Sequence, residues 1–394
     1  GGFFITFITF LMFLAFMTNY PNVAKATQYA KEVLSGKIVA NKWIKLACRR
    51  HFDDLDKVNN KDYPYFFEPK KAERVAKFIQ LLPHTKGKWA AVKQNLRLEP
   101  WQLFALCLPF GWLKKDTGKR RYNKILVFVP RKNGKSAMAA ALGVYMLCAD
   151  GEFGAEVYSG ATTEKQAWEV FRPAKLMVTR TPELKEHFGV EVNASNMSIA
   201  SDGSRFEPII GNPGDGASPS CAIVDEYHEH KDDTLFDTML TGMGARDEPI
   251  MLIITTAGSS IGGACYTMVK DAEKMLDEAM DTPDLWAMIY GKDKDDDWTD
   301  DIALLKANPN YDVSVSGEFL KARQRDAMAS ASKQAVFRTK HLNEWVGAKN
   351  AWMNMAKYTD CPSRLPLSEL AGRPCFIGLD LATKIDMVAT VSVS

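Results

Sequence analysis

The 394-residue sequence has few cysteines and no CxxC pair. Its seven cysteines are scattered, which argues against a zinc site or a disulfide framework and favours a reducing cytosol. The formal net charge is only +2, so no global field indicates a polyanionic partner. Internal repeats and low-complexity tracts are also missing. What remains has the composition of an ordinary globular protein, 46% hydrophobic and 25% charged, with room for two or three domains.

Long apolar runs are missing too, except at the start of the chain. Phe3 to Phe16 carries no charge, but as a helix it would span about 21 Å, short of a bilayer core of about 30 Å. No basic residue precedes it and no small-residue cleavage site follows, as a signal peptide requires. We expect residues 1–16 to be an apolar leader that is not native, with a natural start at Met17. A membrane anchor and a partner-binding or buried helix are the alternatives.

Hydrophobic spacing predicts a helical region over residues 17–97 and an α/β core over 98–259. The core alternates short apolar strands with helices, which predicts a mostly parallel sheet covered on both faces. The expected strands are 124–130, 156–161, 220–226 and 250–256, and the expected helices are 135–149, 163–180 and 232–243.

After Gly258 the pattern becomes helical again, which predicts a helical subdomain over residues 260–352. A polar, proline-bearing stretch over 353–372 is typical of a linker. Residues 373–394 predict two strands joined by a tight turn, as the start of a further domain.

One strand-to-helix junction has the chemistry of a phosphate loop. The stretch "VFVPRKNGKSAMAAALGVYML" runs from Val127 through Gly134-Lys135-Ser136 into an alanine-rich helix. A strict phosphate-loop pattern has a further glycine five residues before Gly134, where this sequence has Val129. Gly134 would still let the backbone amides turn toward an anion, and the helix would add its positive end.

The side chains of this junction suit Mg²⁺-ATP. Lys135 would reach the β- and γ-phosphates, and the Ser136 hydroxyl would ligate Mg²⁺. Arg131, Lys132 and Asn133 would add donors for ATP on the approach to the loop. The alternative is a plain strand-to-helix turn with a surface lysine.

A second apolar strand ends in two acids, in "SCAIVDEYHEH". Because parallel sheets place ligands at the carboxyl ends of their strands, Asp225 would hold Mg²⁺ beside Ser136, mostly through water. Glu226 would polarise the attacking water. The alternative is two acids that cap a strand at the surface. His228 and His230 lack further Cys or His ligands nearby, so we expect them in solvent or behind the metal-binding groups.

Two further features belong to this hypothesis. "IMLIITTAGSS" ends a strand with Thr255 and Thr256, which could sense the γ-phosphate and pass the signal on; the alternative is a simple turn. Gln102, in "LEPWQLFAL", has an amide that can donate to and accept from an adenine edge.

In this order the pieces resemble the large terminase subunit of tailed bacteriophages. The matching stretches are "LEPWQ", "VPRKNGKS", "YSGATTEKQA", "IVDEYHEH", "GMGARDEP", "LIITTAG", "ANPN" and "FRTKHLNEWV". The resemblance implies a P-loop ATPase of the additional-catalytic-glutamate-strand type with a helical lid, followed by a ribonuclease-H-like nuclease domain. It also implies ATP hydrolysis that drives double-stranded DNA into a procapsid, within a ring of subunits that works with a portal protein and a small terminase subunit. The expected location is the host cytoplasm, with no membrane.

The resemblance also suggests roles for residues outside the loop. Arg131 would act on ATP in its own subunit and Arg246 on a neighbour's ATP. In the nuclease, Asp380 would be the first ligand for Mg²⁺ or Mn²⁺, with Asp386 a second contributor. The remaining carboxylates would lie beyond Ser394, so we expect no competent nuclease in this chain.

Two other classes remain open. A helicase-like nucleic-acid translocase would share the ATP site without packaging DNA. A non-enzymatic scaffold or membrane-tethered protein has only Phe3 to Phe16 in its favour.

Overall fold

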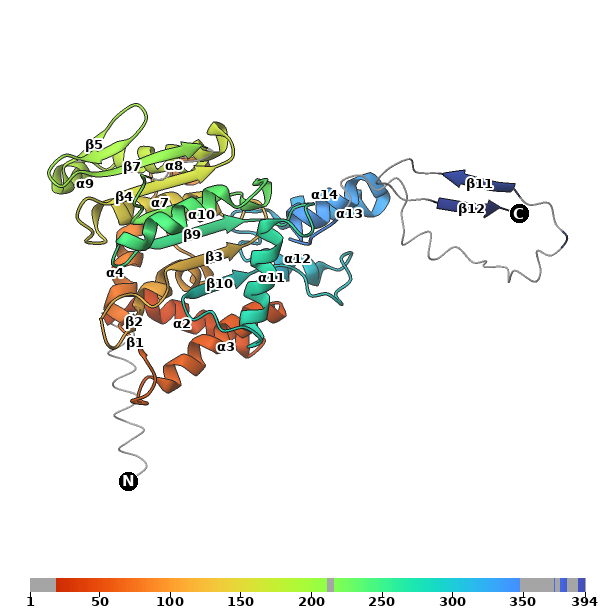
Figure 1. The fold of residues 1–394 in the computed structure, drawn as a ribbon, viewed down its shortest axis with the longest axis horizontal. Helices are drawn as coiled ribbons and strands as arrows, with labels where there is room; N and C mark the ends of the chain where they lie inside the picture. Colours follow the sequence, from red (N-terminus) through yellow and green to blue (C-terminus); the bar gives the residue numbers. More distant parts are fainter. Residues whose placement is uncertain (1–18, 211–215, 348–371, 373–375, 381–388, 394) are drawn as a thin grey trace, which may run out of the picture. The chain divides into compact units, whose positions relative to one another are not determined.

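The computed structural model describes residues 19–210, 216–347, 372, 376–380 and 389–393 (Figure 1). The chain forms two compact units, Gly1–Ala351 and Trp352–Ser394. Among the described residues, no helix is long and apolar enough to cross a membrane. The expected leader, nearly all of the expected linker and Asp386 lie outside the described residues.

The first unit is built around a sheet with the strand order β10-β3-β9-β8-β4-β7-β6-β5. Its strands are β3 (Lys124–Phe128), β4 (Glu156–Ala161), β5 (Val190–Val192), β6 (Met197–Ile199), β7 (Ser204–Ile210), β8 (Cys221–Asp225), β9 (Ile250–Thr255) and β10 (Leu285–Ile289). The neighbours from β10 to β7 are parallel, and β6 and β5 extend the sheet antiparallel. The predicted mostly parallel α/β sheet is confirmed.

The strand order decides which loops meet. Strand β9 pairs with β3 on one side and with β8 on the other, so it separates the strand before Gly134 from the strand that ends at Asp225. This is the additional strand that the resemblance implies. Every residue of β8, β9 and β10 is buried, as expected of parallel strands covered on both faces.

Helices cover both faces of this sheet (Figure 1). The Ser159 hydroxyl of β4 donates to Ala167 O of α8 (Glu164–Thr179), 3.2 Å away. The next residue, Gly160, faces Leu235 of α10 (Thr234–Gly242). Since successive strand residues point to opposite faces, α8 and α10 lie on opposite sides of the sheet. Helix α7 (Lys135–Cys148) packs on α8. Helix α9 (Pro182–Phe188) follows α8 in the chain.

The N-terminal helices share the core of the sheet. They are α2 (Pro21–Leu34), α3 (Lys42–Lys57), α4 (Pro69–Ile79) and α6 (Pro100–Gln102), whereas the short α5 (Gly87–Ala91) has no buried residue. The buried Glu73 carboxylate of α4 accepts from the backbone amides of Asn22 and Val23, which satisfies the first turn of α2. A small antiparallel pair that was not predicted, β1 (Tyr65–Phe67) with β2 (Trp112–Lys114), joins this region to the core.

The prediction that the chain stays helical after Gly258 is wrong at one place. Helix α11 (Ala264–Leu276) is followed by β10, which pairs with β3 in the central sheet. Its five apolar residues, "LWAMI", are too short a run for periodicity to separate strand from helix. Strands β5 to β7 were missed as well.

Helices α12 (Asp301–Ala307), α13 (Gly317–Ala329) and α14 (Ala331–His341) have a small core of their own. Ala303, Leu320, Phe337 and Leu342 belong to it. We refer to residues 301–342 as the helical segment.

The second unit contains β11 (Phe376–Asp380) and β12 (Ala389–Val393), which pair antiparallel with Asp380 opposite Ala389. The two predicted strands are thus confirmed, and the residues that join them lie outside the described part of the chain.

Candidate nucleotide site

The loop between β3 and α7 has the backbone of an anion cradle. Lys132 and Gly134 have φ values of 72° and 85°, in the left-handed region. The amides of residues 132–134 have no backbone acceptor among the described residues. They stand at the amino end of α7, where a helix favours negative charge. This arrangement suits a phosphate group.

The loop lines a pocket of about 680 Å³. The predicted residues in its wall are Gln102, Arg131, Lys132, Gly134, Lys135, Ser136 and Glu226. This size lies in the range of small-molecule sites. The wall also includes residues from 84–98, which sequence reasoning did not assign to the site.

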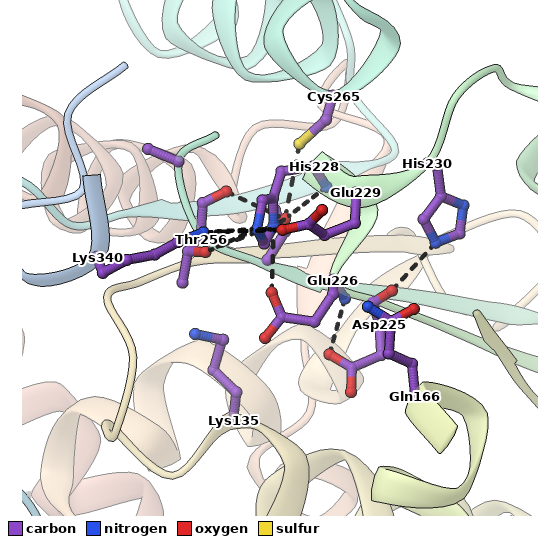
Figure 2. A network of polar contacts seen from close by, with 12 residues as sticks. Lys135, Gln166, Asp225, Glu226, His228, Glu229, His230, Thr256, Cys265 and Lys340 are labelled. Carbon is purple, nitrogen blue, oxygen red and sulfur yellow. Dashed lines mark hydrogen bonds and ion pairs between the residues drawn. The ribbon is translucent and has the colours of Figure 1, made fainter. Parts of the chain in front are cut away.

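Lys135 is buried beneath the pocket. Its Nζ donates to Val129 O at 2.7 Å and to Pro130 O at 3.2 Å. Burial lowers the pKa of Lys135 to about 8, although the nearby Glu226 and Asp225 carboxylates act in the opposite direction. Figure 2 shows the Lys135 side chain near those of Glu226 and Asp225, with no direct contact drawn between them. A phosphate oxygen in the pocket would offer this ammonium a better partner than the two carbonyls.

Asp225 ends β8 and is 3% exposed. Its Oδ1 accepts from the Glu226 amide at 2.8 Å. Burial, with the neighbouring Glu226 carboxylate, raises the pKa of Asp225 to about 7, and Lys135 opposes the shift. A metal ion that binds to Asp225 would therefore displace the proton of this carboxyl group.

Glu226 has a left-handed backbone, with φ at 48°. Its amide also donates to Ile254 O at 3.0 Å, which holds the turn against β9. A left-handed glutamate is strained, and this turn brings its carboxylate to the pocket wall. The structure thus brings Lys135, Asp225 and Glu226 together at one site.

The site offers oxygen atoms of the kind that Mg²⁺ prefers as ligands. Among the described residues, no group of three or more His, Cys, Asp or Glu side chains forms a metal cluster. Magnesium next to a triphosphate needs few protein ligands, since phosphates and water supply the rest. The Asp225 carboxylate and the Ser136 hydroxyl fit that requirement.

The side chain of Asn133 does not line the pocket, and its part in ATP binding stays a prediction. It is fully buried; its Nδ2 donates to Asn308 Oδ1, and its Oδ1 accepts from the Asn310 amide, both at 3.0 Å. Only its backbone amide is left for a phosphate. The side chain instead ties the loop to the helical segment, through the "ANPN" stretch. The sequence contained that stretch, but nothing local signals which residue it meets.

Gln102 lies beside the loop, with Nε2 3.3 Å from where a Cβ on Gly134 would stand. Its Oε1 already accepts from the Glu99 amide at 2.9 Å and caps α6. Its amide nitrogen is therefore the group best placed to meet a base.

The two arginines differ. Arg131 is exposed in the pocket wall. Arg246 is not brought to the pocket: its guanidinium binds Glu152 Oε1 at 2.9 Å and Ser218 O at 2.8 Å. It also lies 3.5 Å from Glu156, the first residue of β4, at the amino-terminal ends of the parallel strands, whereas the phosphate loop follows a carboxyl-terminal end. A role in a neighbour's site stays a prediction and would require these contacts to break.

Thr255 and Thr256 are fully buried and do not line the pocket. Both contact the His228 ring, with Thr255 Oγ1 3.1 Å and Thr256 Oγ1 3.4 Å from Nδ1. Any signal from the γ-phosphate would therefore reach them indirectly. His230 contacts the Asp225 backbone oxygen at 3.1 Å.

Fold and site together define a P-loop nucleotide-binding protein of the additional-strand type. The model of the "Terminase large subunit, ATPase domain" matches residues 100–274, and that of the "Terminase large subunit, endonuclease domain" matches residues 279–394. The chain belongs to the terminase large subunit family.

Two relatives and one solved structure illustrate the likeness. Protein YmfN of Escherichia coli (strain K12) is 49% identical over 175 residues, which cover 44% of this chain and 38% of that protein. The large terminase subunit of Enterobacteria phage HK97 is 25% identical over 338 residues, covering 82% and 62%. The crystal structure of the HK97 large terminase has a TM-score of 0.60 at 23% identity, covering 82% of this chain and 64% of that one. The chain thus spans less than two thirds of each relative.

The matched endonuclease region starts at residue 279, well before the predicted start of a nuclease domain at 373. Strand β10 lies in that region yet pairs with β3 residue for residue, from Leu285 opposite Lys124 to Ile289 opposite Phe128. Because hydrogen bonds define a sheet, we assign β10 to the nucleotide-binding unit.

Proposed function

We propose that this chain is the ATP-hydrolysing subunit of a motor that moves double-stranded viral DNA into a procapsid. The observation that carries the proposal is the meeting of Lys135 and Glu226 in the wall of one pocket beside a phosphate loop, with the buried Asp225 close to both. Both matched family models describe the terminase large subunit, so the helicase-like alternative is not favoured.

Each group has a separate task. The amides of residues 132–134 and the Lys135 ammonium bind phosphate oxygens. Ser136 and Asp225 would hold Mg²⁺, which would supply positive charge against the β- and γ-phosphates. Glu226 accepts a hydrogen bond from the attacking water and orients it toward the γ-phosphorus. Arg131 supplies further positive charge as the phosphate leaves.

Contacts with the helical segment offer a route from hydrolysis to movement. Asn133 binds Asn308 and Asn310, and Ser314 Oγ donates to Lys132 O at 2.6 Å. The Arg131 amide donates to Lys340 O of α14 at 3.1 Å. A change in the contacts between the loop and the phosphate would therefore be transmitted directly to the helical segment.

The wider assembly is part of the proposal. The motor would form a homo-oligomeric ring docked on the procapsid in the bacterial cytoplasm, with a portal protein and a small terminase subunit as partners. Asp380, at the end of β11, would bind Mg²⁺ or Mn²⁺ in the nuclease together with Asp386. Arg246 would act on a neighbour's ATP.

The decisive test separates binding from hydrolysis. We expect the purified chain to hydrolyse ATP with Mg²⁺, and Glu226→Gln to bind Mg²⁺-ATP with similar affinity while its kcat falls about 10²–10⁴-fold. Fluorescent-nucleotide titration and a phosphate-release assay measure the two quantities. The exposed Glu186→Gln on α9 serves as the control and should match the wild type. Wild-type hydrolysis no faster than that of Lys135→Ala would refute the proposal.

A further inference from the structure

His228 is a buried residue to which the proposed mechanism assigns no role. It lies in the short helix η3 (Tyr227–Glu229), two residues after Glu226, and its side chain is 1% exposed. Figure 2 shows the ring between the Glu226 carboxylate and Lys340. A buried polar ring costs free energy unless its nitrogens have hydrogen-bond partners.

One edge of the ring faces the catalytic acid. Its Nδ1 is 3.2 Å from Glu226 Oε2 and 3.1 Å from Thr255 Oγ1. The contact with Glu226 lacks hydrogen-bond geometry, and Oε2 is a buried oxygen with no hydrogen-bond partner among the described residues. A hydrogen on Nδ1 thus has three acceptors within reach, since Thr256 Oγ1 lies 3.4 Å away, and the acceptor that it meets decides how Glu226 is held.

The other edge faces the helical segment. His228 Nε2 lies 3.0 Å from Lys340 Nζ of α14 and 3.1 Å from Glu229 Oε1. The same lysine accepts the Arg131 amide through its backbone oxygen. Lys340 therefore touches both halves of the site, the phosphate loop and the acid turn.

The chemistry of these partners sets the tautomer. Burial, reinforced by the positive charge of Lys340, lowers the pKa of His228 to about 2, so the ring is neutral. An ammonium can only donate, and hence Nε2 must accept from Lys340 and Nδ1 must carry the hydrogen. Glu229 is about half exposed and can turn to water instead.

We propose that His228 is a positioning residue that couples the position of Lys340 to the position of the Glu226 carboxylate. Activation of water by Glu226 then depends on the helical segment being docked. This inference rests on the proposed function. With Lys340 in place, Nε2 is occupied and the Nδ1 hydrogen faces Thr255 Oγ1, with Glu226 Oε2 a further acceptor 3.2 Å from Nδ1. When Lys340 moves away, the ring is free to change tautomer or to rotate, and Glu226 loses its support.

The first experiment compares steady-state ATP hydrolysis by the full chain and its variants. We expect His228→Ala and Lys340→Met each to lower kcat about 10–100-fold, with KM changed less than about threefold, because misplacing a catalytic group mainly affects the transition state. The double variant should be no slower than the worse single variant, since both remove one linkage. His228→Asn, whose amide nitrogen lies near the position of Nδ1, should recover part of the lost kcat.

The controls remove comparable groups elsewhere. Lys333→Met takes a lysine from the same helix α14, and His51→Gln replaces a buried histidine that accepts from Trp112. Neither should change kcat by more than about twofold. Thermal melts check that the variants are folded, and Asn at position 228 keeps the comparison possible if Ala does not fold. Additive losses in the double variant, or normal kcat in folded His228→Ala and Lys340→Met, would overturn the inference.

A second experiment does not depend on hydrolysis. The ¹⁵N spectrum of histidine-labelled protein, with only six histidines to assign, reports which ring nitrogen carries hydrogen. We expect Nδ1–H at His228 in the wild type and a mixture of tautomers in Lys340→Met. A wild-type ring with hydrogen on Nε2 would refute the linkage even if the chain hydrolyses ATP. Conversely, the expected tautomer without any ATP hydrolysis would refute the proposed function and leave the linkage standing.

Discussion

At the scale of single residues, the nucleotide site lowers the stability of the folded protein. Two carboxylates, Asp225 and Glu226, share one buried ammonium, Lys135. The raised pKa of Asp225 and the lowered pKa of Lys135 both mean that burial disfavours their charged forms. Such destabilised clusters are typical of functional sites, where a ligand supplies the missing charge.

The pH dependence of stability follows from the sign of the Asp225 shift. Its pKa rises from 3.8 to about 7 on folding, so the folded state binds this proton more tightly than the unfolded state. The contribution of Asp225 is thus most favourable below pH 3.8 and declines as pH rises to about 7. Asp225→Asn should therefore stabilise the nucleotide-free protein by about 1–3 kcal/mol at pH 8, and by less at pH 5.

Thermal melts at the two pH values measure this effect. Added Mg²⁺-ATP should raise the melting temperature of the wild type and leave that of Asp225→Asn nearly unchanged, because the variant has lost its metal ligand. A variant that melts below the wild type at pH 8 would contradict this account.

At the scale of the elements, the phosphate loop depends on one glycine. Gly134 caps α7 in the left-handed region, and a Cβ there would lie 3.3 Å from Gln102 Nε2. Gly134→Ala should cost roughly 1–2 kcal/mol of stability through backbone strain, and should also weaken ATP binding about tenfold or more.

Gly118→Ala is the matched control. Gly118 also has a positive φ, 68°, but nothing lies within 4 Å of an added Cβ. Its variant should show a similar loss of stability in thermal melts with unchanged nucleotide affinity. Equal affinity for both variants would show that the loop tolerates the change.

Elements in the core were largely predictable from local pattern. The strands and helices that carry Lys135, Asp225 and Thr255 start and end within two residues of the predicted bounds. β10 was missed because five apolar residues carry no period, and β5 to β7 because they are short or irregular. Their place is decided by the sheet edge that they complete.

At the scale of the whole molecule, the proposed packaging function requires a motor that accepts any DNA sequence, so its contacts should be with backbone phosphates. We expect weak binding that is equal for two unrelated duplexes and falls at least about tenfold between 50 and 200 mM salt. Fluorescence anisotropy measures both. A sharp footprint that survives high salt would argue for base-specific readout instead.

The sequence by itself determined the chemistry of the loops. Gly134, Lys135 and Ser136 after an apolar strand, and Asp225-Glu226 after another, indicated a nucleotide site because local order sets which side chains leave a strand end. Only the tertiary structure placed β9 between these strands, turned Asn133 away from the pocket and set His228 against Lys340. These contacts join residues far apart in the chain, and hydrophobic period carries no information about which distant partner completes a buried polar group.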